Sequence, residues 1–132
     1  MSPATENTPP ALHELEAEVM NGVWDSGRAE VTVREMMDVL NAHTKSPRAY
    51  TTYMTIMRRL DDKGLLTRRR DGKTDFYRPV HGRDEYADLR ARAGVDELVE
   101  RYGDVALAHF ARQMGELDPD RRRQLQRLAR KR

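Results

Sequence analysis

The sequence predicts a mainly α-helical protein with one small β-hairpin. Two observations support this fold class: apolar residues recur at helical spacing along most of the chain, and an Asp-Gly pair separates two β-prone runs between residues 65 and 80. The chain has 132 residues, 38% of them hydrophobic, which is enough for one modest core.

The chain is expected to begin with a disordered leader and an amphipathic helix. Residues 1–10 are polar and proline-rich, and they lack the basic and apolar regions of a secretory signal. Residues 11–24 follow with apolar side chains at helical spacing. The predicted stripe consists of Leu12, Leu15, Val19, Val23 and Trp24.

A second helix is expected at residues 32–43, after a polar loop at residues 25–30. Thr32 and Glu35 have capping-box spacing, so each side chain can accept a hydrogen bond from a free backbone N–H of the first turn. The predicted buried face consists of Val33, Met36, Met37 and Leu40.

The third helix is expected at residues 49–63 and has two unlike faces. It follows a short break at residues 44–49 and ends at Gly64, a natural residue after a helix C-terminus. Three threonines in one helix lower its stability, because β-branched side chains lose χ1 freedom. Tyr53, Ile56, Met57 and Leu60 fall on one face, and Thr51, Thr55 and Arg58 fall on the other, flanked by Thr52 and Arg59.

Two strands are expected at residues 65–69 and 73–80, joined by Asp71-Gly72. We expect both residues of this pair to occupy the centre of the turn with positive φ. The tip, RRRDGK, is strongly basic, and Pro79 is expected to end the second strand.

From Arg83 onwards the pattern is helical again. We expect helices at 83–93, 95–103 and 105–117, with a break at Gly94, and a last helix at 118–132 capped by Asp118. Their thin apolar stripes cannot close a core alone, but two copies of the chain can; the alternative is packing on the preceding domain. The candidate dimerisation residues are Val95, Leu98, Val99, Tyr102, Leu107, Phe110 and Met114.

The net charge of +2 is distributed in alternating blocks. Residues 1–44 carry 2 basic and 8 acidic side chains, whereas residues 45–83 carry 11 basic and 4 acidic ones. Residues 84–117 are again acidic, and residues 118–132 carry 7 basic and 2 acidic side chains. The third helix and the hairpin therefore lie in a basic segment, which favours a negatively charged partner.

Three helices followed by a hairpin is the order of a winged helix-turn-helix, in which the third helix enters the DNA major groove. Threonine can contact phosphates, base edges and the thymine methyl, and arginine can reach phosphates or guanine. We therefore predict binding to double-stranded DNA. A protein-interaction module and a non-specific nucleic-acid-binding protein remain alternatives. The predicted DNA-binding side chains are Tyr50, Thr51, Thr52, Thr55, Arg58 and Arg59 of the third helix and Arg68, Arg69, Arg70 and Lys73 of the wing.

Four segments in register, LHELEAEVMNGVW, TVREMMDVLN, AYTTYMTIMRRLDDKGLL and FYRPV, resemble the penicillinase repressor family of winged helix-turn-helix regulators. The resemblance covers residues 11–82 well and the remainder loosely. It implies a winged-helix DNA-binding domain at 11–82, a helical dimerisation region at 83–132, and a homodimeric repressor of an inverted-repeat operator. It also places Lys45 and Arg48 near phosphates, and Thr51, Thr52 and Thr55 where the family reads bases.

The resemblance further implies how repression ends in the antibiotic-responsive branch of the family. There a membrane sensor protease triggers cleavage before a phenylalanine of the dimerisation region, which corresponds to the His109–Phe110 bond here. The family usually has asparagine before the cut, whereas this chain has histidine. The alternative role for Phe110 is a core residue at the dimer seam. The copper-responsive branch uses cysteine pairs, and this chain has no cysteine.

Other residue patterns speak against an enzyme, a cofactor or a metal site. The histidines at 13, 43, 81 and 109 have no metal-binding spacing, and no glycine-rich phosphate loop or serine nucleophile motif occurs. No apolar run is long enough for membrane insertion. We therefore expect a cytoplasmic protein without cofactors.

Overall fold

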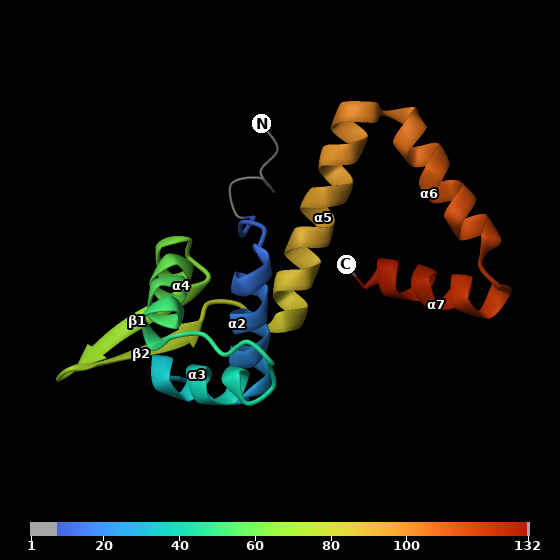
Figure 1. The fold of residues 1–132 in the computed structure, drawn as a ribbon. Helices are drawn as coiled ribbons and strands as arrows, with labels where there is room; N and C mark the ends of the chain where they lie inside the picture. Colours follow the sequence, from blue (N-terminus) through green and yellow to red (C-terminus); the bar gives the residue numbers. More distant parts are fainter. Residues whose placement is uncertain (1–7, 132) are drawn as a thin grey trace. The chain divides into compact units, whose positions relative to one another are not determined.

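A computed structural model describes residues 8–131, drawn as a ribbon in Figure 1. The described residues divide into two compact units, one up to Ala91 and one from Arg92 onwards. None of the helices described is both long and apolar enough to cross a bilayer. The elements are α2 (Glu14–Asp25), α3 (Val33–Asn41), α4 (Tyr50–Asp62), β1 (Leu66–Asp71), β2 (Thr74–Pro79), α5 (Arg83–Tyr102), α6 (Asp104–Glu116) and α7 (Pro119–Arg130).

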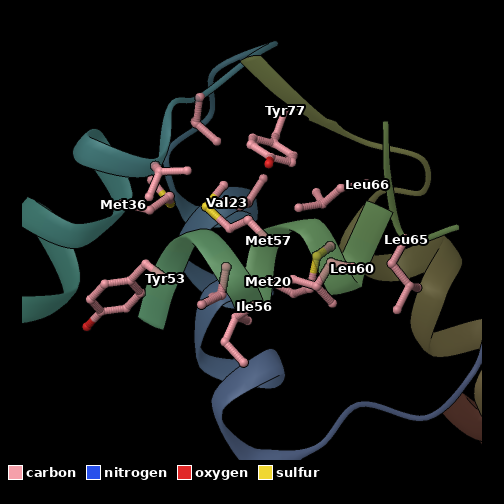
Figure 2. Packing of buried hydrophobic residues seen from close by; sticks show 13 residues of the cluster. Met20, Val23, Met36, Tyr53, Ile56, Met57, Leu60, Leu65, Leu66 and Tyr77 are labelled. Carbon is pink, nitrogen blue, oxygen red and sulfur yellow. The ribbon is translucent and has the colours of Figure 1, made fainter. Parts of the chain in front are cut away.

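The first unit closes around one apolar core, to which α2, α3, α4 and the hairpin all contribute (Figure 2). The faces predicted for the first three helices are confirmed, although Leu12, Leu15, Trp24, Met37 and Leu40 are only partly buried. Burying a side chain of this size fully contributes about 1.5–3 kcal/mol. The core consists of Val19, Met20, Val23, Val31, Val33, Met36, Tyr53, Ile56, Met57, Leu60, Leu65, Leu66 and Tyr77.

The helix ends follow the predicted signals. The hydroxyl of Thr32 accepts from the Glu35 backbone N–H at 3.2 Å, and the Glu35 carboxylate accepts from the Thr32 N–H at 3.0 Å. Gly64 follows α4 with φ of 80°, a left-handed conformation that glycine adopts without strain. At α7 the carboxylate of Asp118 accepts from the Arg121 N–H at 2.9 Å.

The prediction for the hairpin turn is wrong by one residue. Asp71 pairs with Thr74 at the ends of β1 and β2, so Gly72 and Lys73 occupy the centre of the turn. Gly72 has φ of 63°, and no other residue type among those described has positive φ. Glycine at the first central position is typical of a type II′ turn, which needs positive φ there alone.

The loop before α3 contains pairing that the sequence did not predict. Val31 pairs with Tyr77 of β2, with N–O distances of 2.9 and 2.8 Å in the two directions. Both side chains are fully buried. This pairing joins the hairpin to the start of α3, so the wing is fixed by backbone hydrogen bonds on both sides of β2.

Two further predictions differ from the structure. The predicted break at Gly94 is wrong, because α5 runs unbroken from Arg83 to Tyr102; a glycine inside a helix costs only about 1 kcal/mol. In the expected leader, residues 1–7 lie outside the described residues. Pro9 is buried, and the carbonyl oxygens of Pro9 and Pro10 accept from Arg90 and Tyr86 of α5.

The second unit has far less buried apolar surface. Ala106 is its one buried side chain among the residues described. The guanidinium of Arg122 on α7 donates to the carbonyl oxygens of Met114, Gly115 and Leu117, at 3.0–3.2 Å. These bonds satisfy free carbonyls at the C-terminus of α6 and fasten α7 to that end.

Candidate nucleic-acid interface

The outer face of α4 carries the predicted hydroxyl and guanidinium groups. Thr51, Thr55, Arg58 and Arg59 are exposed, and Thr52 is half-buried. Within residues 8–131 none of the three threonine hydroxyls has a hydrogen-bond partner. The two-faced helix predicted from the sequence is therefore confirmed, and its polar face is free to contact a ligand.

The opposite face anchors α4 in the core. Tyr53, Ile56, Met57 and Leu60 are buried among residues of α2 and α3, as Figure 2 shows for the labelled side chains. The Tyr53 hydroxyl donates to the Asn41 side-chain oxygen at 2.7 Å. Burial on one side of the helix thus determines the direction in which the threonines point.

Asn41 fixes the turn between α3 and α4, a role that the sequence did not reveal. Its side-chain oxygen accepts from the Arg48 N–H at 3.0 Å, and its side-chain nitrogen donates to the Arg48 carbonyl at 2.9 Å. The Arg48 guanidinium pairs with Glu18 at 3.1 Å, whereas Lys45 is exposed. Tyr53 and then Glu18 raise the pKa of Arg48. Of these two predicted phosphate contacts, only Lys45 has no ion-pair partner within the described chain.

The wing arginines are exposed, but each has a carboxylate nearby. Arg69 donates two hydrogen bonds to Glu30, at 3.0 and 3.1 Å, and stacks on Phe76 at 4.7 Å. The Arg69 hydrogen bond lowers the pKa of Glu30, and Glu30 in turn raises that of Arg69. Arg69 therefore fastens the wing to the loop before α3, in addition to its predicted place near phosphates.

Arg68 and Arg70 extend from β1 on the other side of the wing. Both approach Asp75 of β2, and Arg68 also lies 3.6 Å from Asp61. Lys73 is exposed at the hairpin tip, and no carboxylate of residues 8–131 pairs with it. Lys73 is thus a wing cation whose charge is not paired within the described residues.

A hollow of about 410 Å³ connects the outer face of α4 with the wing and the N-terminus of α3. Four cationic side chains and one carboxylate line it, so the hollow suits an anion. Arg34 and Asp75 also line this hollow, and neither was among the DNA-binding residues predicted from the sequence. For Asp75 the sequence did offer a signal, because it is an acidic residue within a basic hairpin. The lining residues are Thr32, Val33, Arg34, Tyr50, Met54, Arg58, Arg70, Lys73, Thr74 and Asp75.

A buried ion pair holds α2 against the end of α4, behind this surface. Glu16 is fully buried and lies 2.8 Å from the Lys63 ammonium, and its carboxylate also accepts from the His13 N–H at 2.9 Å. Burial by itself raises the pKa of Glu16, but the bonds from Lys63 and His13 outweigh it and lower the pKa. The carboxylate is therefore charged at neutral pH.

The candidate dimerisation residues lie on α5 and α6 of the second unit. Val95, Leu98, Tyr102 and Leu107 are exposed, although they are apolar or aromatic, and Val99, Phe110 and Met114 are half-buried. His109 of the candidate cleavage bond is exposed on α6. The second unit thus presents apolar side chains to its surroundings.

Together the core, the crossing helices and the hairpin define a winged helix-turn-helix protein. A family model described as "Penicillinase repressor" matches residues 12–131. Transcriptional regulator BlaI of Mycobacterium tuberculosis, found in two strains, is 37% identical over 113 residues, which are 83% of this chain and 78% of the relative. The solution structure of the DNA-binding domain of the repressor BlaI superimposes with a TM-score of 0.50 at 25% identity, covering 60% of this chain and 92% of that domain.

The chain belongs to the penicillinase repressor family, whose members are DNA-binding transcriptional repressors rather than enzymes. The expected resemblance and fold class are therefore confirmed. The individual DNA contacts, the dimer and the release of repression stay predictions.

Proposed function

We propose that this chain represses transcription as a cytoplasmic homodimer that binds an inverted-repeat operator. In each half-site α4 lies in the major groove, and the wing lies against the adjacent backbone or minor groove. The observation that carries this proposal is the free hydroxyl and guanidinium face of α4, which is continuous with the basic wing through the hollow. Base readout belongs mainly to the threonines and affinity mainly to the cations.

The second unit supports the dimer. Its exposed apolar side chains would lose their contact with water in a self-complementary interface, as a two-fold dimer requires. A dimer also matches the two-fold symmetry of an inverted repeat, with half-sites one helical turn or a multiple of it apart. We propose that α5 and α6 supply this interface.

The test is selection of bound duplexes from a random-sequence DNA pool, followed by measurement of affinity against salt. The recovered duplexes should share an inverted repeat and bind roughly 10³-fold or more tightly than random duplex. Affinity should fall steeply with salt, because each phosphate contact contributes about −0.9 to the log–log slope. Salt-steep binding without sequence preference would indicate a non-specific coating protein, and a failure to bind duplex at all would indicate a protein-interaction module.

We also propose that repression ends by cleavage of the His109–Phe110 bond, triggered by a membrane sensor protease after antibiotic exposure. His109 is exposed, but the bond lies within α6, so this helix must open locally before a protease can act. Mass spectrometry of the chain from cells treated with a β-lactam should detect a fragment ending at His109. Relief of repression with the chain intact would contradict this route.

A further inference from the structure

Asp75 of β2 lies at the centre of a cluster of three arginines. Its carboxylate is 3.9 Å from Arg58, 3.7 Å from Arg68 and 3.9 Å from Arg70. Its side chain is 13% exposed, whereas that of Asp71 at the hairpin tip is 74% exposed. Asp75 is therefore a largely buried anion on a surface that otherwise attracts anions.

The three arginines come from two elements that must act together on DNA. Arg58 lies on α4, and Arg68 and Arg70 lie on β1, with Arg70 directly opposite Asp75 in the hairpin register. Among residues 8–131, Asp75 is the one carboxylate that pairs with Arg58 or Arg70. Asp75 thus joins Arg58 of α4 to the wing, beside a second ion pair between Asp61 of α4 and Arg68 of β1.

The cluster extends inward to the core. The Tyr77 hydroxyl is buried beside it, and burial together with the negative charge of Asp75 raises the pKa of Tyr77, against the opposing effect of Arg68 and Arg58. On the outer side Arg58, Arg70 and Asp75 all line the hollow described above. The carboxylate therefore occupies the wall of the hollow, between the core and any incoming anion.

We propose that Asp75 is a positioning residue that sets sequence discrimination, by holding Arg58 and Arg70 as one unit at a site for a DNA backbone phosphate. This inference rests on the proposed function. At 3.7–3.9 Å the guanidiniums are ion-paired without direct hydrogen bonds to Asp75, so the N–H groups that face this carboxylate stay available. The Nε–H of Arg70 is the exception, because it donates to the Gly72 carbonyl oxygen at 3.2 Å. A phosphate can bind Arg58 and Arg70 together only inside the hollow. It reaches the hollow only when α4 and the wing contact the DNA at the same time.

The same carboxylate weakens binding to poorly placed phosphates. A phosphate that reaches only one arginine competes with Asp75 for it, because the carboxylate is already near. Neutralising Asp75 adds one net positive charge to the cluster and also releases Arg58 from the wing. Affinity for random duplex and discrimination between duplexes should then change in opposite directions, which simple loss of folding cannot produce.

The experiment compares Asp75→Asn with Asp71→Asn in the full chain. Asp71→Asn is a matched control, because it removes the same charge from the same hairpin but not from the arginine cluster. Each variant is titrated over a salt series with two probes, the duplex recovered by selection and a scrambled duplex of equal length and composition. Circular dichroism melting reports folding for both variants.

We expect Asp75→Asn to bind the scrambled duplex about fivefold more tightly near 0.1 M salt, with a steeper salt slope, because one more counterion is released. Affinity for the selected duplex should stay level or fall, so discrimination should drop about fivefold or more. Asp71→Asn should strengthen binding to both duplexes in parallel. Asp75→Glu, which keeps the charge, should retain the wild-type discrimination.

If Asp75→Asn raised the affinity for both duplexes by the same factor, or lowered it by the same factor, the role proposed for Asp75 would be wrong. If this variant does not fold, Arg58→Gln and Arg70→Gln, singly and together, replace it, since both side chains are exposed. If the two arginines act as one unit, the loss of discrimination in the double variant should differ from the sum of the two single losses. A double loss equal to that sum would refute the coupling. A wild-type chain that binds both probes equally would instead overturn the proposed function, and this inference with it.

Discussion

The two units of the chain differ in what they leave exposed. The first unit buries thirteen residues in a closed core and presents hydroxyl and guanidinium groups on α4 and the wing. The second unit buries Ala106 and exposes Val95, Leu98, Tyr102, Val105 and Leu107. A closed core with a basic surface suits an anionic partner, whereas an exposed apolar surface gains stability when it is buried against another surface.

This difference predicts opposite responses to salt. Contacts between the basic surface and DNA should weaken as salt rises, because counterion release drives them. An interface of apolar side chains should not weaken, because apolar burial is not screened by ions.

The largest effect should come from shortening the second unit. A chain that ends at Phe110 loses part of α6 and all of α7, so we expect a weaker dimer and an affinity for the inverted repeat that is about 10²–10⁴-fold lower. Affinity for a single half-site should change little, since the first unit is intact. Sedimentation and duplex titration check both statements. A shortened chain that stays dimeric and binds the full operator normally would refute the role of these helices.

The next effect concerns the buried ion pair of the first unit. Glu16→Gln leaves the partly exposed Lys63 ammonium without its charged partner and should lower the free energy of unfolding by about 1.5–3 kcal/mol. Glu97→Gln is the matched control in the second unit, where an exposed pair with Arg101 at 3.4 Å contributes at most about 1 kcal/mol. Urea unfolding at neutral pH measures both. Equal losses of stability in the two variants would show that the Glu16–Lys63 pair stabilises the fold no more than the exposed Glu97–Arg101 pair.

The same pair predicts the acid response. Because the folded pKa of Glu16 is lowered from its ordinary value of 4.5, its stabilising effect is complete above that value and is lost as the pH falls through the folded pKa. The wild-type chain should lose stability below about pH 4.5, and Glu16→Gln should lose less over the same window. If the two chains lost the same stability below about pH 4.5, protonation of Glu16 would not be the cause.

Smaller effects are expected from the hydroxyl face of α4. Thr52→Ala or Thr55→Ala removes one contact to bases, so discrimination between selected and scrambled duplex should fall by roughly 1 kcal/mol, or about fivefold. Affinity for scrambled duplex should remain nearly constant. Parallel titrations of the two duplexes provide the measurement, and equal losses on both would assign the threonines to phosphates instead.

The smallest effect should come from the wing tip. Lys73→Ala removes an exposed cation without breaking an ion pair, so it should weaken binding to all duplexes by a similar factor. The log–log salt slope should become shallower by about 0.9. A selective loss for the recovered duplex would mean that the wing reads sequence, contrary to the division of roles proposed here.

Hydrophobic periodicity and helix-capping signals predicted most of the helices and their buried faces. The faces of α4, the Thr32 capping box and the Asp118 cap were all predictable, because they depend on residues within one or two helical turns. The turn at Gly72 and the unbroken α5 were not, because one glycine permits several local conformations and neighbouring residues decide among them. The sequence predicted which residues of α4 are exposed, but it did not predict the ion pair between Arg58 of α4 and Asp75 of the wing.

The sequence by itself determined the order of helices and hairpin, the family, and the separation of a hydroxyl face from an apolar one. Only the tertiary structure decided which charges meet: Glu16 with Lys63, Glu30 with Arg69, and Asp75 with Arg58. Periodicity reports which side of a helix is buried, because this depends on local spacing. Pairing between distant charges depends on how elements cross, and that crossing is set by packing of the whole core.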